Sequence, residues 1–151
     1  MDLSKYAISS INNCLSIGAQ NGKLAKENYK SAKKGEFSLN LGGDHSIATG
    51  SIFGLKEAFP SLKVVWVDAH ADCNTAETSP SGNYHGMPLS PVLGLMKKGT
   101  IPGFDWCYPN LKFSDLVYIG LRHLDEGEKV VIAENNIKTY DMNDVTGLGI
   151  G

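Results

Sequence analysis

Apolar and polar positions alternate with different periods along this 151-residue chain, and each change of period marks a predicted element. Residues 22–34 favour a helix, which Gly35 ends. The alternation of apolar and polar residues over 36–41 is typical of a strand. Apolar side chains then recur at helical spacing between residues 44 and 59, and Pro60 marks the end of that helix. This part of the chain therefore predicts a helix, a strand and a second helix.

The rest of the chain continues the same alternation. Residues 62–67 form a nearly continuous apolar, β-branched run, which is typical of a strand buried in a parallel sheet. Two further strands are predicted at residues 116–120 and 137–140, with a helix over 125–135 between them and another beginning near Asn143. Such an order predicts an α/β domain with a mostly parallel sheet, whose ligands gather at the carboxyl ends of the strands.

Composition and charge narrow the function classes. A formal net charge of −2 and a sequence pI near 6.0 provide no basic surface for nucleic acid or an anionic membrane. No apolar run reaches the roughly 20 residues of a membrane helix, and the first residues lack a signal-peptide pattern. The wide spacing of Cys14, Cys73 and Cys107 suits reduced thiols better than disulfides. We therefore expect a cytoplasmic protein that binds neither nucleic acid nor membrane.

A group of potential metal ligands directly follows the strand predicted at residues 62–67. Asp68, His70 and Asp72 occupy every second position, and in extended backbone such positions project to one side. Two carboxylates and an imidazole at the end of a buried strand favour a bound cation, and this ligand set suits manganese, magnesium or iron. A solvated strand end is the alternative. Cys73 falls at an odd offset, so we expect it to pack rather than to bind metal.

His45 is a further candidate ligand, because it follows the strand predicted at residues 36–41. Gly42 and Gly43 favour a tight turn there, and His45 begins the next helix. A single histidine in this position is more often structural, so the motif is informative only beside the first group. Asp44 is either the N-cap of the helix or a partner that holds the imidazole.

Three motifs together resemble those of a known family. They are Leu-Gly-Gly-Asp-His-Ser at 41–46, Trp-Val-Asp-Ala-His-Ala-Asp-Cys-Asn-Thr at 66–75 and Ser-Gly-Asn-Tyr-His-Gly-Met-Pro-Leu at 81–89. The motifs resemble the metal and substrate motifs of the ureohydrolases, and the third resembles the arginase branch of that family. The resemblance runs from about Leu15 to the C-terminus. It implies the three-layer α-β-α fold of that family, with a mostly parallel sheet.

The resemblance also implies an activity and a metal centre. The activity is hydrolysis of L-arginine to L-ornithine and urea by a hydroxide that bridges two Mn²⁺ ions. By position in the motifs, His45 and Asp72 correspond to ligands of one manganese and His70 to a ligand of the other. Asp68 corresponds to the bridge between them. Two adjacent cations lower the pKa of a bridging water, which agrees with this assignment.

His85 lies near the end of a long polar loop that follows the metal ligands. Residues 72–84 are rich in Ser, Thr, Asn, Pro and Gly, and loops of such length are usually functional. The resemblance implies that His85 transfers a proton near the metal centre. An imidazole titrates near neutral pH, so it could protonate the leaving amine.

Four further positions correspond to substrate-binding residues of the family. Asn74 and Ser81 match positions that bind the α-carboxylate of the substrate. Asp125 and Glu128 match positions associated with its α-amino group. The alternative for these two acids is structural, because acidic residues in the first turn of a helix are favoured by the helix dipole.

Residues 1–151 are expected to form part of a ureohydrolase domain. The opening strand of the family has no counterpart before Leu15 in this chain. The C-terminal half of the family also has none, and that half includes the Ser-Phe-Asp-Val-Asp-Gly-Leu-Asp-Pro motif, which supplies two more aspartate ligands. Two alternatives remain open: an agmatinase-type amidinohydrolase, and a truncated, inactive protein that acts only by association. Homotrimers are usual in the family, so a homo-oligomer is expected.

Overall fold

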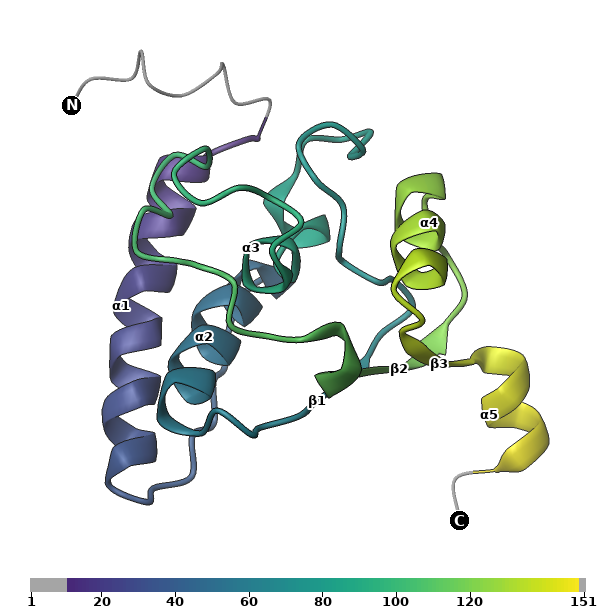
Figure 1. Ribbon diagram of the computed structural model, residues 1–151, viewed down its shortest axis with the longest axis horizontal. Coiled ribbons are helices and arrows are strands. Elements are labelled where there is room, and N and C mark those ends of the chain that lie inside the picture. Colours follow the sequence, from purple (N-terminus) through teal and green to yellow (C-terminus); the bar gives the residue numbers. More distant parts are fainter. Residues whose placement is uncertain (1–10, 150–151) are drawn as a thin grey trace.

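Three parallel strands form the sheet in residues 11–149, which are the residues that this computed structural model describes (Figure 1). They are β1 (Val64–Val67), β2 (Leu116–Leu121) and β3 (Lys138–Asp141), hydrogen-bonded in that order. All three were expected from the sequence, with small differences at their ends. The predicted α/β class with a parallel sheet is therefore confirmed.

Helices flank this sheet. α1 and α2 pack against each other beyond β1, whereas α4 and α5 lie near β2 and β3 (Figure 1). The chain passes from β2 through α4 to the parallel strand β3, and both elements were predicted. No helix in the described range is long and apolar enough to cross a membrane. The α-helices are α1 (Cys14–Lys33), α2 (Ala48–Ala58), α3 (Ser90–Leu93), α4 (Glu126–Glu134) and α5 (Met142–Leu148), and the 3-10 turns are η1 (His45–Ile47), η2 (Tyr84–Gly86) and η3 (Phe113–Asp115).

The first helix begins earlier than the sequence suggested. We expected it over residues 22–34, but α1 already starts at Cys14. Its buried side carries small and polar residues, including Gly18, Asn21 and Ala25, instead of an apolar stripe. This composition hides the helical period, because the buried stripe of a helix is normally recognised by its large apolar residues.

The prediction of a strand at residues 36–41 is wrong. The segment is extended in outline, but no strand pairs with it in the described structure. Asn40 fixes it to the helices by donating to the side-chain oxygens of Asn28 and Ser51 over 3.1 Å each. The alternate side chains of Phe37 and Leu41 are 91% and 88% exposed. A strand needs a neighbour for its backbone hydrogen bonds, and sequence alternation cannot provide one.

The two faces of the sheet differ in burial. Trp66 of β1 and Tyr118 of β2 are paired in register and are both buried. On the opposite face Val65 and Val67 are 61% and 72% exposed. Successive side chains of a strand point to opposite faces, so the face with Trp66 belongs to the core and the other is partly open.

Candidate metal centre

His45 reaches the site because Asp44 fixes the start of the turn that carries it. The backbone of Asp44 is extended, and its Oδ1 accepts a 2.8 Å hydrogen bond from the N–H of Ser46. Asp44 is thus the N-cap of η1, which resolves the alternative that the sequence left open. Hydrogen bonds from Ser46 hold the pKa of Asp44 below its ordinary value. The capped turn then leads directly into α2.

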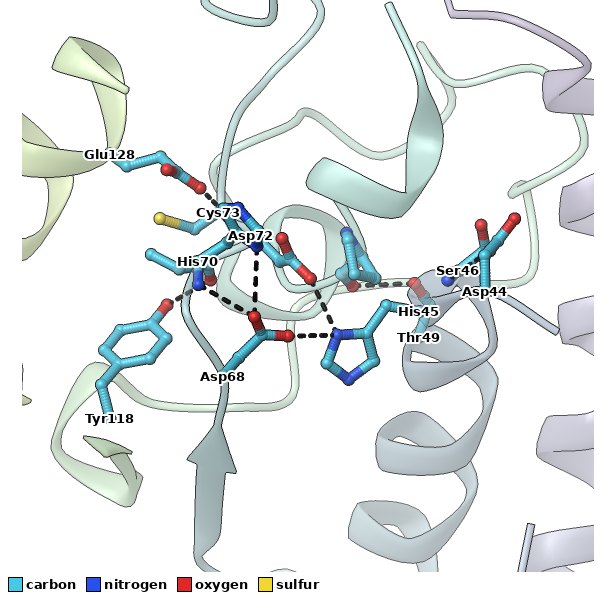
Figure 2. A network of polar contacts seen from close by, with 12 residues as sticks. Asp44, His45, Ser46, Thr49, Asp68, His70, Asp72, Cys73, Tyr118 and Glu128 are labelled. Carbon is cyan, nitrogen blue, oxygen red and sulfur yellow. Dashed lines mark hydrogen bonds and ion pairs between the residues drawn. The ribbon is translucent and has the colours of Figure 1, made fainter. Parts of the chain in front are cut away.

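Three predicted ligands converge on one point. His45 Nδ1 lies 2.8 Å from Asp68 Oδ2 and 2.9 Å from Asp72 Oδ2 (Figure 2). One ligand atom from each residue lies within 4.8 Å of the others. His45 comes from the turn before α2, while both aspartates follow β1. Residues more than 20 positions apart in the chain therefore meet at the carboxyl end of β1, where ligands of parallel sheets gather.

Asp72 reaches this point by a left-handed backbone conformation rather than by the expected extended spacing. The strand ends at Val67, and Asp72 has φ of 50°. Aspartate tolerates this conformation better than most residues do. The prediction that positions 68, 70 and 72 project to one side of an extended chain was therefore wrong, although Asp68 and Asp72 still face the same imidazole.

The two carboxylates raise the pKa of His45. The hydrogen bond to Asp72 is the largest effect that raises its pKa, and the negative charges of Asp72 and Asp68 act in the same direction. Partial burial opposes them by disfavouring the charged ring. Asp72 is the most enclosed of the three, with a side chain that is 7% exposed. The carboxylates therefore attract a positive charge to this point, either a proton or a metal ion.

His70 lies on the other side of Asp68. Its Nδ1 is 3.2 Å from Asp68 Oδ1, and the same oxygen accepts a 2.9 Å hydrogen bond from the His70 N–H. Asp68 therefore faces His45 with one oxygen and His70 with the other. The His70 side chain is 57% exposed, so it is the most open member of the group.

Buried contacts hold the backbone between the ligands. The Tyr118 hydroxyl donates to the Ala71 carbonyl over 2.8 Å (Figure 2), and the Leu89 N–H donates to the Asp72 carbonyl over 3.2 Å. Cys73 is fully buried, and burial raises the pKa of its thiol to about 12. Cys73 belongs to the buried core, as the sequence indicated, and its sulfur is not among the three converging ligand atoms.

Two of the proposed substrate residues meet beside this backbone. Asn74 is buried, and its Nδ2 donates to Asp125 Oδ2 over 2.8 Å. Thr78 donates to Asn74 Oδ1 over 2.9 Å, which fixes the orientation of the amide. This network joins the long loop after Asp72 to the start of α4.

Glu128 makes structural contacts at the start of α4, which is the alternative to substrate binding that the sequence left open. Its side chain accepts a hydrogen bond from the Asp125 N–H over 3.1 Å and another from the Cys73 N–H over 3.3 Å. Burial is the main cause that raises its pKa above the ordinary value. Glu128 therefore ties the first turn of α4 to the loop that carries the ligands.

The remaining predicted residues, Ser81 and His85, lie in and before η2, which packs against the η1 turn that carries His45. His85 is exposed in η2, and its charge contributes to the lowered pKa of Asp44. Ser81 is exposed, and its hydroxyl accepts from the Asn83 N–H over 3.2 Å. A cavity of about 790 Å³ lies beside His70, with Asp125 and Glu128 in its wall. Ser81 and His85 do not line it.

Sequence reasoning missed the aromatic contact at the centre. The rings of His45 and Trp66 stack, with centroids 4.1 Å apart and planes inclined by 21°. Trp66 had been noted only as part of an apolar strand. The sequence did offer one sign of this contact: Trp66 lies two residues before Asp68, and residues two apart in an extended chain project to the same side.

The donor set fits a divalent metal ion. One imidazole nitrogen and two carboxylate oxygens converge, and two negative charges offset those of the cation. The converging donors are nitrogen and oxygen atoms, which suit manganese and magnesium better than metals that select sulfur. His45, Asp68 and Asp72 could hold such an ion.

Comparisons with known proteins identify relatives of the whole described region. The model of the arginase family matches residues 2–151. The hepatic arginase of Aquarana catesbeiana is 46% identical over 143 residues, which cover 93% of this chain and 44% of that protein. Arginase-1 of Homo sapiens is 45% identical over 143 residues, which again cover 93% of this chain and 44% of that protein. The solved structure of the Bacillus caldovelox arginase matches with a TM-score of 0.86 and 44% identity, covering 99% of this chain and 50% of that chain. The chain thus spans less than half the length of these curated relatives.

Proposed function

This chain belongs to the arginase family, and on that premise we propose that it carries the first metal-binding part of an enzyme that hydrolyses L-arginine to L-ornithine and urea. The observation that carries the proposal is the approach of Asp68 Oδ2 and Asp72 Oδ2 to His45 Nδ1 over 2.8 and 2.9 Å. Manganese, when bound by such ligands, activates water for attack on the guanidinium carbon.

We assign the metal ligands as follows. His45 and Asp72 would hold one Mn²⁺, His70 would hold a second, and Asp68 would contribute to both. Support for the bridge comes from the two oxygens of Asp68, which face different imidazoles. Four ligands are few for two dications, so we expect the first ion to bind more tightly than the second.

We further propose roles for the residues around the metal centre. Asn74 and Ser81 donate to the α-carboxylate of arginine, and Asp125 and Glu128 accept from its α-amino group. The cavity beside His70 supports the second assignment, because Asp125 and Glu128 line it. His85, exposed on its turn, transfers a proton to the leaving amine.

A chimera tests the activity independently of chain length. Residues 11–149 would replace the corresponding part of the Bacillus caldovelox arginase, which is 44% identical. Urea release would be measured with Mn²⁺ on L-arginine and, in parallel, on agmatine, which lacks the α-carboxylate. We expect hydrolysis of arginine well above that of agmatine, and its loss in His70→Ala.

Either of two results would contradict the proposal. A folded chimera that releases no urea from arginine would show that these residues do not support the reaction. Faster release from agmatine would show that Asn74 and Ser81 do not select an α-carboxylate. The isolated 151-residue chain, titrated with Mn²⁺ in parallel, should bind the first ion and lose it in Asp72→Asn.

A further inference from the structure

We infer that Trp66 is a positioning residue for His45: its indole face fixes the plane of the imidazole so that Nδ1 points at Asp68 and Asp72. The inference rests on the proposed function, because it assumes that His45 binds the metal. Its expected consequence is a higher affinity for a divalent cation.

The contact between the two rings has the geometry of a stack. Their centroids are 4.1 Å apart and their planes are inclined by 21°. Aromatic pairs at such distances attract each other beyond the effect of burial alone. Trp66 is 4% exposed, whereas the His45 side chain is 40% exposed. The rigid partner is therefore the indole, and the imidazole is the ring that needs support.

The carboxylates alone do not fix the imidazole. Asp68 and Asp72 both contact Nδ1, which is one edge of the ring. The χ2 torsion of a histidine has broad minima. A contact at one edge of the ring therefore leaves the imidazole free to rotate about that contact. Stacking on Trp66 removes this freedom, since the ring can no longer tilt without losing its contact with the indole.

The position of Trp66 in β1 makes it a firm platform. It pairs in register with Tyr118, whose hydroxyl donates to the carbonyl of Ala71 between the ligands. The buried indole Nε1 has no hydrogen-bond partner in the described structure. A buried tryptophan usually finds one for this group. What Trp66 contributes to the site is therefore the face of its ring and not a polar contact.

Trp106 provides a matched control. It is the other tryptophan of the chain, and it packs against Phe53 and Phe104 at α1 and α2. Its Nε1 donates to the Gly18 carbonyl over 3.0 Å. Replacing it also removes an indole from the fold, but this change leaves the ligands untouched. Loss of stability can therefore be separated from loss of ligand position.

The experiment measures Mn²⁺ affinity of the 151-residue chain by electron paramagnetic resonance, for wild type, Trp66→Leu, Trp66→Phe and Trp106→Phe. We expect Trp66→Leu to weaken binding by about tenfold, the lower range for groups that orient metal ligands. Trp66→Phe keeps an aromatic face and should restore most of the affinity, and Trp106→Phe should leave it unchanged. Circular dichroism verifies folding, and Trp66→Met, with the same expected loss, replaces Trp66→Leu if that variant unfolds.

Fluorescence provides a second readout. In Trp106→Phe the emission comes from Trp66 alone, so bound Mn²⁺, which is paramagnetic, should quench it with the dissociation constant found by resonance. Unchanged affinity in folded Trp66→Leu or Trp66→Met, or equal weakening in Trp66→Phe, would overturn the inference while leaving the proposed function intact. Absence of Mn²⁺ binding by the folded wild-type chain would overturn both.

Discussion

Asp68 is the residue on which the arrangement of the ligands depends. Its Oδ2 faces His45, and its Oδ1 accepts from the backbone N–H of His70 and lies 3.2 Å from that residue's Nδ1. A carboxylate can contact two neighbouring residues in this way because each oxygen has its own lone pairs. The neighbouring Asp72 contacts only the His45 ring among these imidazoles and is the more deeply enclosed of the two acids.

The raised pKa of His45 predicts how the stability of the metal-free protein depends on pH. The folded state holds the His45 proton more tightly than the unfolded state, whose value is near 6.5. This contribution is fully present below the unfolded pKa and is lost as pH rises through the folded pKa. We therefore expect the free energy of unfolding of the wild type, relative to His45→Gln, to fall as pH rises from the unfolded value near 6.5 through the raised pKa of the folded state. Urea denaturation at several pH values measures it, and a constant difference would contradict the prediction.

At the scale of elements, the close packing of α1 on α2 determines where the His45 turn lies. Glycines of α2 face the backbone of α1, and the N–H of Gly50 donates to Asn21 Oδ1 over 2.8 Å. A Cβ at Gly54 would lie 2.2 Å from the Ala25 carbonyl oxygen. The two helices approach so closely because these positions carry no side chain.

Gly54→Ala should therefore destabilise the fold. The added methyl has no room, and overpacking of this kind costs about 1–3 kcal/mol, more than the gain of about 1 kcal/mol in helix propensity. Gly147→Ala in α5 is the control, because no atom lies within 4 Å of the Cβ position there. That variant should be neutral or slightly stabilising. Chemical denaturation of both variants decides the matter: equal free energies of unfolding would refute the close contact.

For the whole molecule, the distribution of exposed apolar side chains is uneven. Phe37, Leu39 and Leu41 project outward from the extended segment, with exposures between 72% and 91%. Val65 and Val67 add a second exposed set on β1. Apolar groups gathered in this way on a sheet edge or face favour association with other surfaces.

Replacing Val65 and Val67 together by Thr should weaken self-association of the 151-residue chain. Each change replaces a methyl by a hydroxyl but keeps the branching that suits a strand. Two lost methyl contacts at about 0.8 kcal/mol each correspond to an association constant about tenfold lower. Sedimentation velocity over a range of concentrations measures the change. Val130→Thr, at a 52% exposed position of α4, is the control and should have no effect. An unchanged association constant in the double variant would show that this face does not mediate contacts.

Features that depend on local order along the chain could be predicted from the order of residues. The three strands and the helices α2, α4 and α5 follow from period and composition, because burial on a fixed face repeats every two or about 3.6 residues. Asp68 and Asp72 were recognisable as candidate ligands because charged groups directly after an apolar strand need a partner. His45 was a candidate only beside this group, because a single histidine after a predicted strand is more often structural.

Features that depend on contacts between distant residues became known from the folded structure. The segment 36–41 lacks a partner strand, and α1 buries Gly18 and Asn21 instead of large apolar groups. The left-handed turn at Asp72 and the stack of Trp66 on His45 were likewise not predicted from the local pattern. Hydrogen bonding between strands, close helix packing and ring stacking each need a specific neighbour in space. Their energies are therefore fixed by the fold and not by the order of residues alone.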